Sequence, residues 1–316
     1  MLGAGGVLGF AWAVGALTAL EEAEGIDCRD AEMIVGTSAG SITAAMLGCG
    51  VAVSTMLAHQ SGIPVEGDVD IDYDYETDSG GSLPPLPRPG LGSARLLARA
   101  ALHPREITPM AALSSVLPRG RGTLEPVTDL VAGVLSEGAD WAPHPSVWTV
   151  AMDYATGRRV PFGRAGEPAA RLPDAVTASC SIPGWYTPVR IGEHRYVDGG
   201  TCSSTSLDLL AGADLPEVFV IAPMVSFGYD RPRSVPALLE RRWRRLTTGR
   251  LEREAERVRA GGTRVTMLGP GPDDLAAIGA NMMDPARRDR VLTTSLRTSA
   301  EALAAEPAGQ DVGEAV

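Results

Sequence analysis

Apolar and polar positions are grouped along the chain in blocks that predict strands and helices in turn. Four short apolar runs predict β-strands, at residues 32–35, 147–152, 218–222 and 264–268. Longer stretches with helical spacing predict helices, at residues 10–23, 41–48, 234–260 and 287–305. The run at 218–222 is apolar throughout, as expected for a strand buried on both faces of a parallel sheet. Alternating strands and helices predict an α/β fold with a mainly parallel central sheet flanked by helices.

The middle of the chain is less regular. An acidic run at residues 68–76 and a Gly/Ser/Pro-rich stretch at 79–89 predict a mobile surface insertion over about 61–91, which could serve as a lid. Residues 94–134 have a helical pattern that prolines interrupt. A short helix is expected at 173–179, and a short strand at 195–197.

Composition and charge narrow the class of protein. Hydrophobic residues make up 44% and charged residues 21% of 316 residues, which is ordinary for a globular protein with a sizeable core. The net charge of −11 disfavours nucleic acid as a partner and broad docking on anionic membranes. Every basic side chain apart from histidine is an arginine, which excludes lysine-based Schiff-base chemistry and a phosphate loop of the Walker type.

The cysteines and the apolar segments suggest where the protein resides. Cys28, Cys49, Cys180 and Cys202 form no CxxC pair and no metal-ligand spacing, so unpaired thiols in a reducing compartment are expected. The first residues lack the basic and apolar regions of a secretory signal. No uninterrupted apolar run reaches the roughly 18 residues of a membrane span. A cytoplasmic location is therefore expected, with peripheral membrane contact as a further hypothesis.

The strongest chemical signal is the sequence GTSAG at residues 36–40. It follows a predicted strand and precedes a helix of small residues, the context in which a GxSxG turn exposes a nucleophilic serine. Gly36 and Gly40 would remove side chains that collide in so tight a turn. Ser38 is therefore the candidate nucleophile. The alternative is a glycine turn that only joins a strand to a helix.

A second signal is the cluster of glycines at residues 3–9, at the head of the first predicted helix. Backbone N–H groups at such a position can bind an anion, which in acyl transfer is the oxyanion of the tetrahedral intermediate. A dinucleotide loop is a weak alternative, because GxGxxG spacing from Gly3 and Gly5 would require glycine where Leu8 stands. A simple tight turn is the remaining alternative.

The third signal is Asp198-Gly199-Gly200 after a short strand. An aspartate in this setting can point into a site with little steric cover, although Asp-Gly is also a strong hairpin signal. A Ser-His-Asp triad would require Asp153 or Asp174 with His194, and none of the four histidines has the sequence setting of a catalytic residue. A serine–aspartate dyad explains this distribution better.

Taken together, these motifs resemble those of the patatin-like phospholipase family. The order is the same: glycine loop, helix, strand, GTSAG, and a distant Asp-Gly-Gly, with the stretch 178–184 resembling the family's segment before the aspartate. The resemblance covers about residues 1–225 and implies a three-layer α/β/α fold. It implies that Ser38 is the nucleophile, that Asp198 activates it without a histidine, and that backbone N–H groups of Gly5, Gly6 and Val7 form the oxyanion hole.

The resemblance also implies the substrate and the domains. The substrate would be a lipid ester, namely a phospholipid, lysophospholipid or acylglycerol, and neither a metal nor an organic cofactor is implied. A catalytic domain is expected over residues 1–225, including the insertion at about 61–91. Residues 226–316 would form a helical extension with one strand.

Two departures from the family pattern lead to a second hypothesis. The glycine loop of the family usually carries Arg or Lys where this chain has Leu8, and an apolar strand usually precedes the loop, whereas this sequence starts at Met1. A poorly anchored loop would weaken the oxyanion hole. The alternative function is therefore a patatin-like binding or regulatory protein that does not hydrolyse.

The helix predicted at 234–260 suggests a further hypothesis. Its arginine-rich side, with Arg241, Arg242, Arg244 and Arg245, could contact a membrane. The alternative is a solvated face with Arg–Glu pairs involving residues such as Glu252 and Glu254.

Overall fold

The computed structural model describes residues 1–63, 71–74, 77–78, 81–228, 230–232 and 234–305. At its centre two pairs of strands are parallel. β1 (Ile34–Thr37) pairs with β2 (Val147–Asp153), and β6 (Glu217–Ile221) pairs with β7 (Arg264–Leu268). Leu2 forms parallel bridges with both Gly36 and Ile221, so the first residues lie between β1 and β6 and join the two pairs.

The remaining strands are antiparallel. β3 (Arg159–Phe162) and β5 (His194–Asp198) both pair with β2, and β4 (Val189–Ile191) pairs with β5. β4 and β5 are joined by two residues, of which Gly192 has a φ of 59°, and so short a turn only permits antiparallel pairing. The α/β class is confirmed. The sheet is mixed rather than mainly parallel, because of these hairpins.

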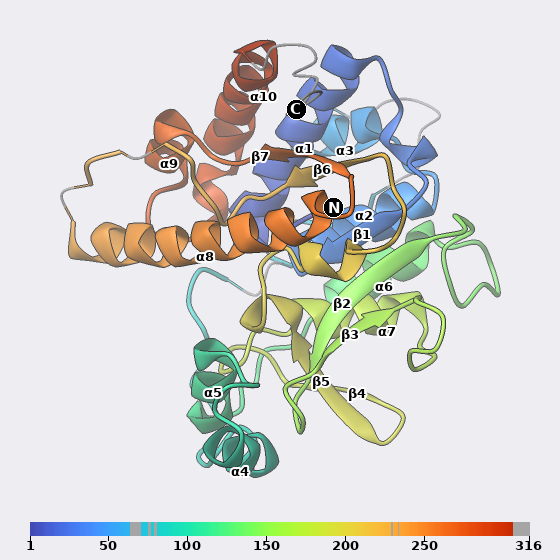
Figure 1. The fold of residues 1–316 in the computed structure, drawn as a ribbon. Helices are drawn as coiled ribbons and strands as arrows, with labels where there is room; N and C mark the ends of the chain where they lie inside the picture. The colour runs from blue at the N-terminus through green and yellow to red at the C-terminus, as the bar shows by residue number, and fades with distance from the viewer. Residues whose placement is uncertain (64–70, 75–76, 79–80, 229, 233, 306–316) are drawn as a thin grey trace, which may run out of the picture.

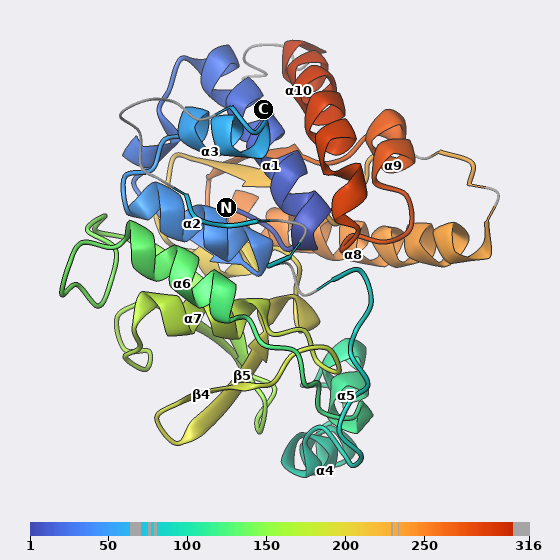
Figure 2. The same cartoon turned by 180° about the vertical axis from the view of Figure 1, so that it is seen from behind.

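Helices cover both faces of the sheet. Figures 1 and 2 show α8 (Val235–Arg259) on one face and α1 (Gly6–Glu24), α2 (Ala39–Gly48) and α7 (Leu172–Cys180) on the other. Successive residues of β1 point into different cores. Ile34 packs with residues of α1, α2 and α7, whereas Val35 packs with Leu251 of α8. The three-layer α/β/α arrangement follows from this alternation.

α1 is the central helix of the fold. By length and composition it could cross a membrane, yet most of it is buried within the protein. α10 (Arg288–Ala305) packs along it, where the Ser295 hydroxyl donates a hydrogen bond of 2.6 Å to the Trp12 carbonyl. The predicted end at Gly25 is confirmed, since this residue has a φ of 64° and donates to the Glu21 carbonyl.

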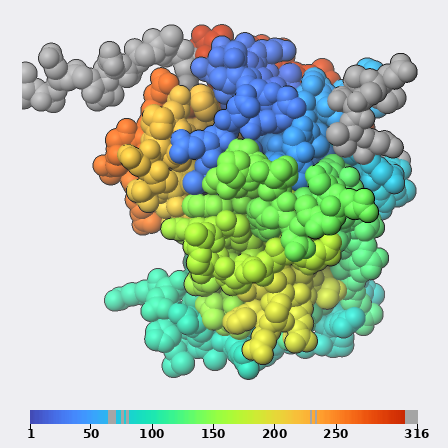
Figure 3. Space-filling model, turned by 90° about the vertical axis from the view of Figure 1, so that its right-hand side faces the viewer, coloured from blue at the N-terminus to red at the C-terminus, as the bar shows by residue number. Residues whose placement is uncertain are grey.

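The other helices surround this body. They are α3 (Val53–Gln60), α4 (Ala94–Leu102), α5 (Pro109–Val116), α6 (Glu125–Val134) and α9 (Pro272–Ile278). α4 and α5 lie at the lower end in Figure 1, and the middle of the chain forms a continuous surface below the N-terminal residues in Figure 3. The interrupted helical pattern at 94–134 is confirmed, whereas α3, α9, β3 and β4 were not predicted.

Two predictions about organisation have no direct test. The mobile insertion at 61–91 falls partly outside the described residues, and of the described ones Ile71 is buried. The domain boundary near residue 225 stays a prediction. In the structure, the chain after it contributes β7 to the sheet and α10 to the packing around α1.

Candidate active site

Ser38 occupies a strained turn between β1 and α2. Its φ of 54° and ψ of −126° place a residue with a side chain in a region that favours glycine. A Cβ at Gly36 would lie 2.2 Å from the Gly40 carbonyl oxygen, and a Cβ at Gly40 would lie 2.2 Å from the Leu2 carbonyl oxygen. Both glycines are therefore required for the close approach of the backbone, as the sequence predicts.

Strand pairing brings Asp198 to this turn. β1 and β5 pair with successive parts of β2, where Thr37 is opposite Val150 and Asp198 is opposite Ala151. Because β1 is parallel and β5 antiparallel to β2, their carboxyl ends meet. A Cβ on Gly199 would lie 2.3 Å from the Val150 carbonyl oxygen, so glycine is required at this junction.

The end of α7 holds both strand ends in place. The Ser179 hydroxyl accepts a hydrogen bond of 2.8 Å from the Ser38 N–H and donates one of 2.6 Å to the Val150 carbonyl. The Ser181 carbonyl accepts a hydrogen bond of 2.9 Å from the Asp198 N–H. The sequence comparison singled out this stretch only as a resemblance, and the structure gives it a positioning role.

The Asp198 carboxyl is buried in a way that changes its acidity. Burial raises its pKa to about 6, although hydrogen bonding from the Ser38 side chain and from the Gly200 N–H, at 2.7 Å from Oδ1, lowers it. The carboxylate therefore binds a proton more readily than an exposed aspartate. A group with such a pKa is suited to general base chemistry near neutral pH.

The glycine loop has unpaired N–H groups beside the site. Gly5 caps α1, and Gly6 has a φ of 58°, a left-handed conformation that glycine adopts without strain. Among the described residues, the N–H groups of Gly5, Gly6 and Val7 donate no hydrogen bond. Gly6 and Val7 line the same cavity as Ser38, whereas Gly5 is not among its lining residues. This helix end can stabilise a negative charge.

The structure shows where the two departures from the family pattern lie, namely Leu8 and the first residues of the chain. Leu8 is fully buried in the hydrophobic core. The Leu2 N–H and carbonyl pair with Val35 and Thr37 of β1, and the Gly3 N–H donates to Ile221 of β6. Residues 1–3 therefore fill a strand position, and the loop that follows them is anchored to the sheet.

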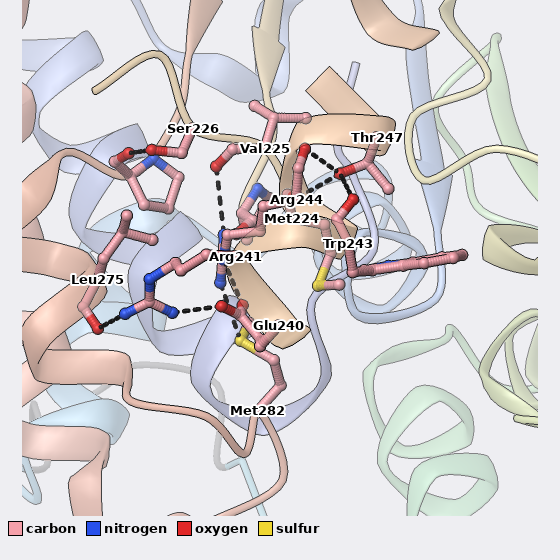
Figure 4. Close-up of polar contacts among 12 residues, drawn as sticks. Met224, Val225, Ser226, Glu240, Arg241, Trp243, Arg244, Thr247, Leu275 and Met282 are labelled. Carbon is pink, nitrogen blue, oxygen red and sulfur yellow. Dashed lines mark hydrogen bonds and ion pairs between the residues drawn. The ribbon is translucent and has the colours of Figure 1, made fainter. Parts of the chain in front are cut away.

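Behind the loop lies a buried arginine on α8. The Arg244 guanidinium donates to Glu240, to the Pro223 and Val225 carbonyls and to the Met282 sulfur (Figure 4). The Pro223 side chain packs against the backbone of Gly5 and Gly9, and the Met282 carbonyl accepts from the Leu8 N–H at 2.9 Å. Arg244 thus ties together the two segments on which the glycine loop rests.

An apolar cavity opens beside Ser38. It is a pocket that opens to solvent between α1, α2, α6 and α7, and it contains about 630 Å³ of atom-free space when the open solvent at its mouth is included. Its polar lining groups include the side chains of Ser38, Cys180, Tyr73 and Tyr186. Its apolar lining residues are Val7, Phe10, Ala39, Ile42, Met46, Ile71, Leu124, Val127, Leu130, Ile182 and Met283. Such a lining suits a hydrocarbon chain.

The histidine alternatives do not assemble around Ser38. His194 does pair with Asp153, at 2.7 Å, but it begins β5 whereas Asp198 ends it. At the usual rise per residue the two positions are roughly 13 Å apart. Within the described chain, no histidine lines the cavity at Ser38.

The cysteines are unpaired, and Cys180 lies in the site. Its sulfur is 3.7 Å from the Ser41 hydroxyl, and burial raises the pKa of its thiol, which the Asp198 carboxylate raises further. Sequence reasoning did not assign a role to Cys180, or to Ser179, Pro223 and Met282.

Comparison with known proteins identifies the family. The family model of patatin-like phospholipases matches residues 1–211, and the chain therefore belongs to this family, whose members are lipid acyl hydrolases. A search of curated proteins finds no match. Among solved structures, VipD from Legionella pneumophila is similar with a TM-score of 0.40 and 14% identity, over 96% of this chain and 66% of that one.

Proposed function

We propose that this protein hydrolyses carboxylic esters of lipids by two-step acyl transfer, with Ser38 as the nucleophile and Asp198 as its base. The meeting of Ser38 and Asp198 at the ends of β1 and β5 carries the proposal. The cavity and the free N–H groups of the glycine loop support it.

In the first step Asp198 takes the hydroxyl proton as the Ser38 oxygen attacks the ester carbonyl. The negative charge moves to the carbonyl oxygen, where the N–H groups of Gly6 and Val7 stabilise it, with Gly5 completing the loop. The C–O bond to the alcohol then breaks, and the alcohol leaves with the proton from Asp198. Water, deprotonated by Asp198, then attacks the acyl-enzyme. The bond between the acyl carbon and the Ser38 oxygen breaks, Asp198 returns the proton to that oxygen, and the fatty acid is released.

The cavity favours a substrate with an acyl chain. Ile42, Met46 and Leu130 form part of its apolar walls, so a hydrocarbon chain would displace water from them. Phospholipids, lysophospholipids and acylglycerols all carry such a chain. The residues around Ser38 do not favour one of these three lipid classes over another.

The test is labelling of the purified protein with a fluorophosphonate probe, which reacts with activated serines. Wild type should label, Ser38→Ala should not, and Asp198→Asn should label at least a hundredfold more slowly because the base is absent. Ser115→Ala is the matched control, since Ser115 is a buried serine on α5 that does not line the cavity and should leave labelling intact.

Folding of each variant is checked by circular dichroism. If folded wild type does not label, the nucleophile is not activated and the non-catalytic function replaces this proposal. Labelling that survives in Ser38→Ala would assign the nucleophile to another residue. Liberation of fatty acid from defined lipids then identifies the substrate.

A further inference from the structure

α8 has two faces of opposite character over its first turns. On the inner face, Arg241 and Arg244 are buried and donate to Asp230, Glu240 and several backbone carbonyls. The hypothesis that these two arginines contact a membrane is therefore wrong. Their bonds fix the rotation of α8 about its axis, so that its outer face cannot turn inward.

The outer face is apolar and exposed. Val235, Leu239 and Leu246 are 68%, 64% and 63% exposed, and their spacing of four and seven residues places them on one side of the helix. Leu238, beside them, is 52% exposed. Figures 1 and 2 both show this end of α8 extending past α9 at the edge of the molecule.

Charges on this part of the helix are sorted by face. Arg242 and Arg245 are exposed among the leucines, whereas Glu240, the single acidic residue between 234 and 249, is turned inward to the two buried arginines. Exposed charge on the outer face is therefore positive, in a chain whose net charge is −11. Later turns expose both Glu252 and Arg253 and lack this bias.

We propose that this outer face of α8, formed by Val235, Leu238, Leu239, Arg242 and Leu246, docks on an anionic lipid surface. Apolar side chains enter the boundary between headgroups and acyl chains, and the arginine pairs with lipid phosphates. α8 is linked to the cavity lining through residues 282 and 283, since Arg244 donates to the Met282 sulfur and Met283 lines the cavity. Docking would hold the protein at its substrate, but it does not depend on hydrolysis by Ser38.

The experiment measures binding of the Ser38→Ala protein to sedimented vesicles, so that hydrolysis plays no part. The vesicles contain phosphatidylcholine alone or mixed with phosphatidylglycerol. We expect binding to the mixed vesicles that weakens with salt. Val235→Ser/Leu239→Ser should reduce it by roughly tenfold or more, and Arg242→Gln by roughly fivefold.

Matched variants test whether the effect belongs to this face. Ile63 and Leu102 are 66% and 75% exposed elsewhere, so Ile63→Ser/Leu102→Ser should bind as wild type does. Arg253→Gln is the control for charge. The same surface substitutions are also made in the protein that keeps Ser38. Its hydrolysis of a soluble ester should be unchanged, which separates docking from catalysis.

Three results would overturn the proposal. The first is absence of vesicle binding by the parent protein, and the second is equal binding by the Val235/Leu239 and Ile63/Leu102 variants. The third is a parent protein that is a dimer in solution and does not bind vesicles, and that becomes a monomer in the Val235→Ser/Leu239→Ser variant. The face would then be a contact between two copies of the chain.

Discussion

At the residue scale, the site depends on the Asp198 carboxyl group, whose burial disfavours its ionised form. Asp198 is buried and accepts a hydrogen bond from the Gly200 N–H, yet no cation is among the groups that set its pKa of about 6. This contrasts with Asp208, whose ion pair with Arg159 lowers its pKa despite burial. The absence of a paired cation leaves Asp198 able to take a proton from Ser38.

This carboxyl group predicts a pH dependence of activity. Because the base acts only when ionised, kcat/KM for an uncharged ester should rise as pH increases through about 6 and then level off. One pH unit below that value the rate should be roughly tenfold lower. Initial rates between pH 5 and 8 test this, with circular dichroism at each pH to show that the protein stays folded. A flat profile would contradict a role for Asp198 as the base.

At the element scale, α2 connects the reactive serine to the depth of the cavity. Ser38, Ile42 and Met46 line the cavity at intervals of four residues, so they follow one side of α2. The distance from Ser38 to Met46 along the helix is about 12 Å. Met46 is 1% exposed and lies toward the far end, where a long acyl chain would reach it.

Met46 is therefore predicted to limit the length of the acyl chain. Met46→Ala should raise the ratio of kcat/KM for a hexadecanoyl ester to that for an octanoyl ester by roughly tenfold, because it lengthens the cavity. Met56→Ala is the matched control. Met56 is as buried but does not line the cavity, so this change should cost similar stability and leave the ratio unaltered. An equal ratio in both variants would refute the assignment.

The elements also show where sequence reasoning succeeds. Strands were predicted at 32–35, 147–152, 218–222 and 264–268 because apolar runs between turn signals record burial directly. The structure has strands at 34–37, 147–153, 217–221 and 264–268, so the first lies two residues later than predicted. β3 and β4 were missed because polar or proline residues interrupt short strands, and their pairing comes from hairpin geometry. Ser38 and the glycine loop had motif signals. The supporting roles of Ser179 and Arg244 were not predicted, although Ser179 lies in the stretch that the resemblance includes, since these roles depend on contacts between segments far apart in the chain.

At the scale of the whole molecule, the mixed sheet is what assembles the site. Parallel β1 and antiparallel β5 approach each other along β2, and a sheet of parallel strands alone would not direct these two carboxyl ends toward one another. Residues 1–3 lie between β1 and β6 and place the glycine loop at the same edge. The fold therefore brings together a nucleophile, a base and unpaired N–H groups from three distant segments.

Holding an ionised Asp198 in that junction should reduce the stability of the whole fold. Its pKa is about 6 when folded, above the value of about 3.9 in an unfolded chain, so the folded protein binds the proton more tightly. The free energy of unfolding should therefore fall as pH rises from about 4 to 6, by roughly 3 kcal/mol, and stay low at pH 8.

Asp198→Asn removes this charge and keeps an oxygen that can accept from the Gly200 N–H. At pH 8 it should be more stable than wild type by about 1–3 kcal/mol in urea unfolding, and near pH 4 the two should be alike. Asp153→Asn provides the contrast, because the Asp153 carboxylate accepts from the Ala155 and Thr156 N–H groups and pairs with His194. That variant should be destabilised at pH 8. Loss of stability in Asp198→Asn at pH 8 would mean that the carboxylate is stabilised in the fold, and it would remove the basis for its raised pKa.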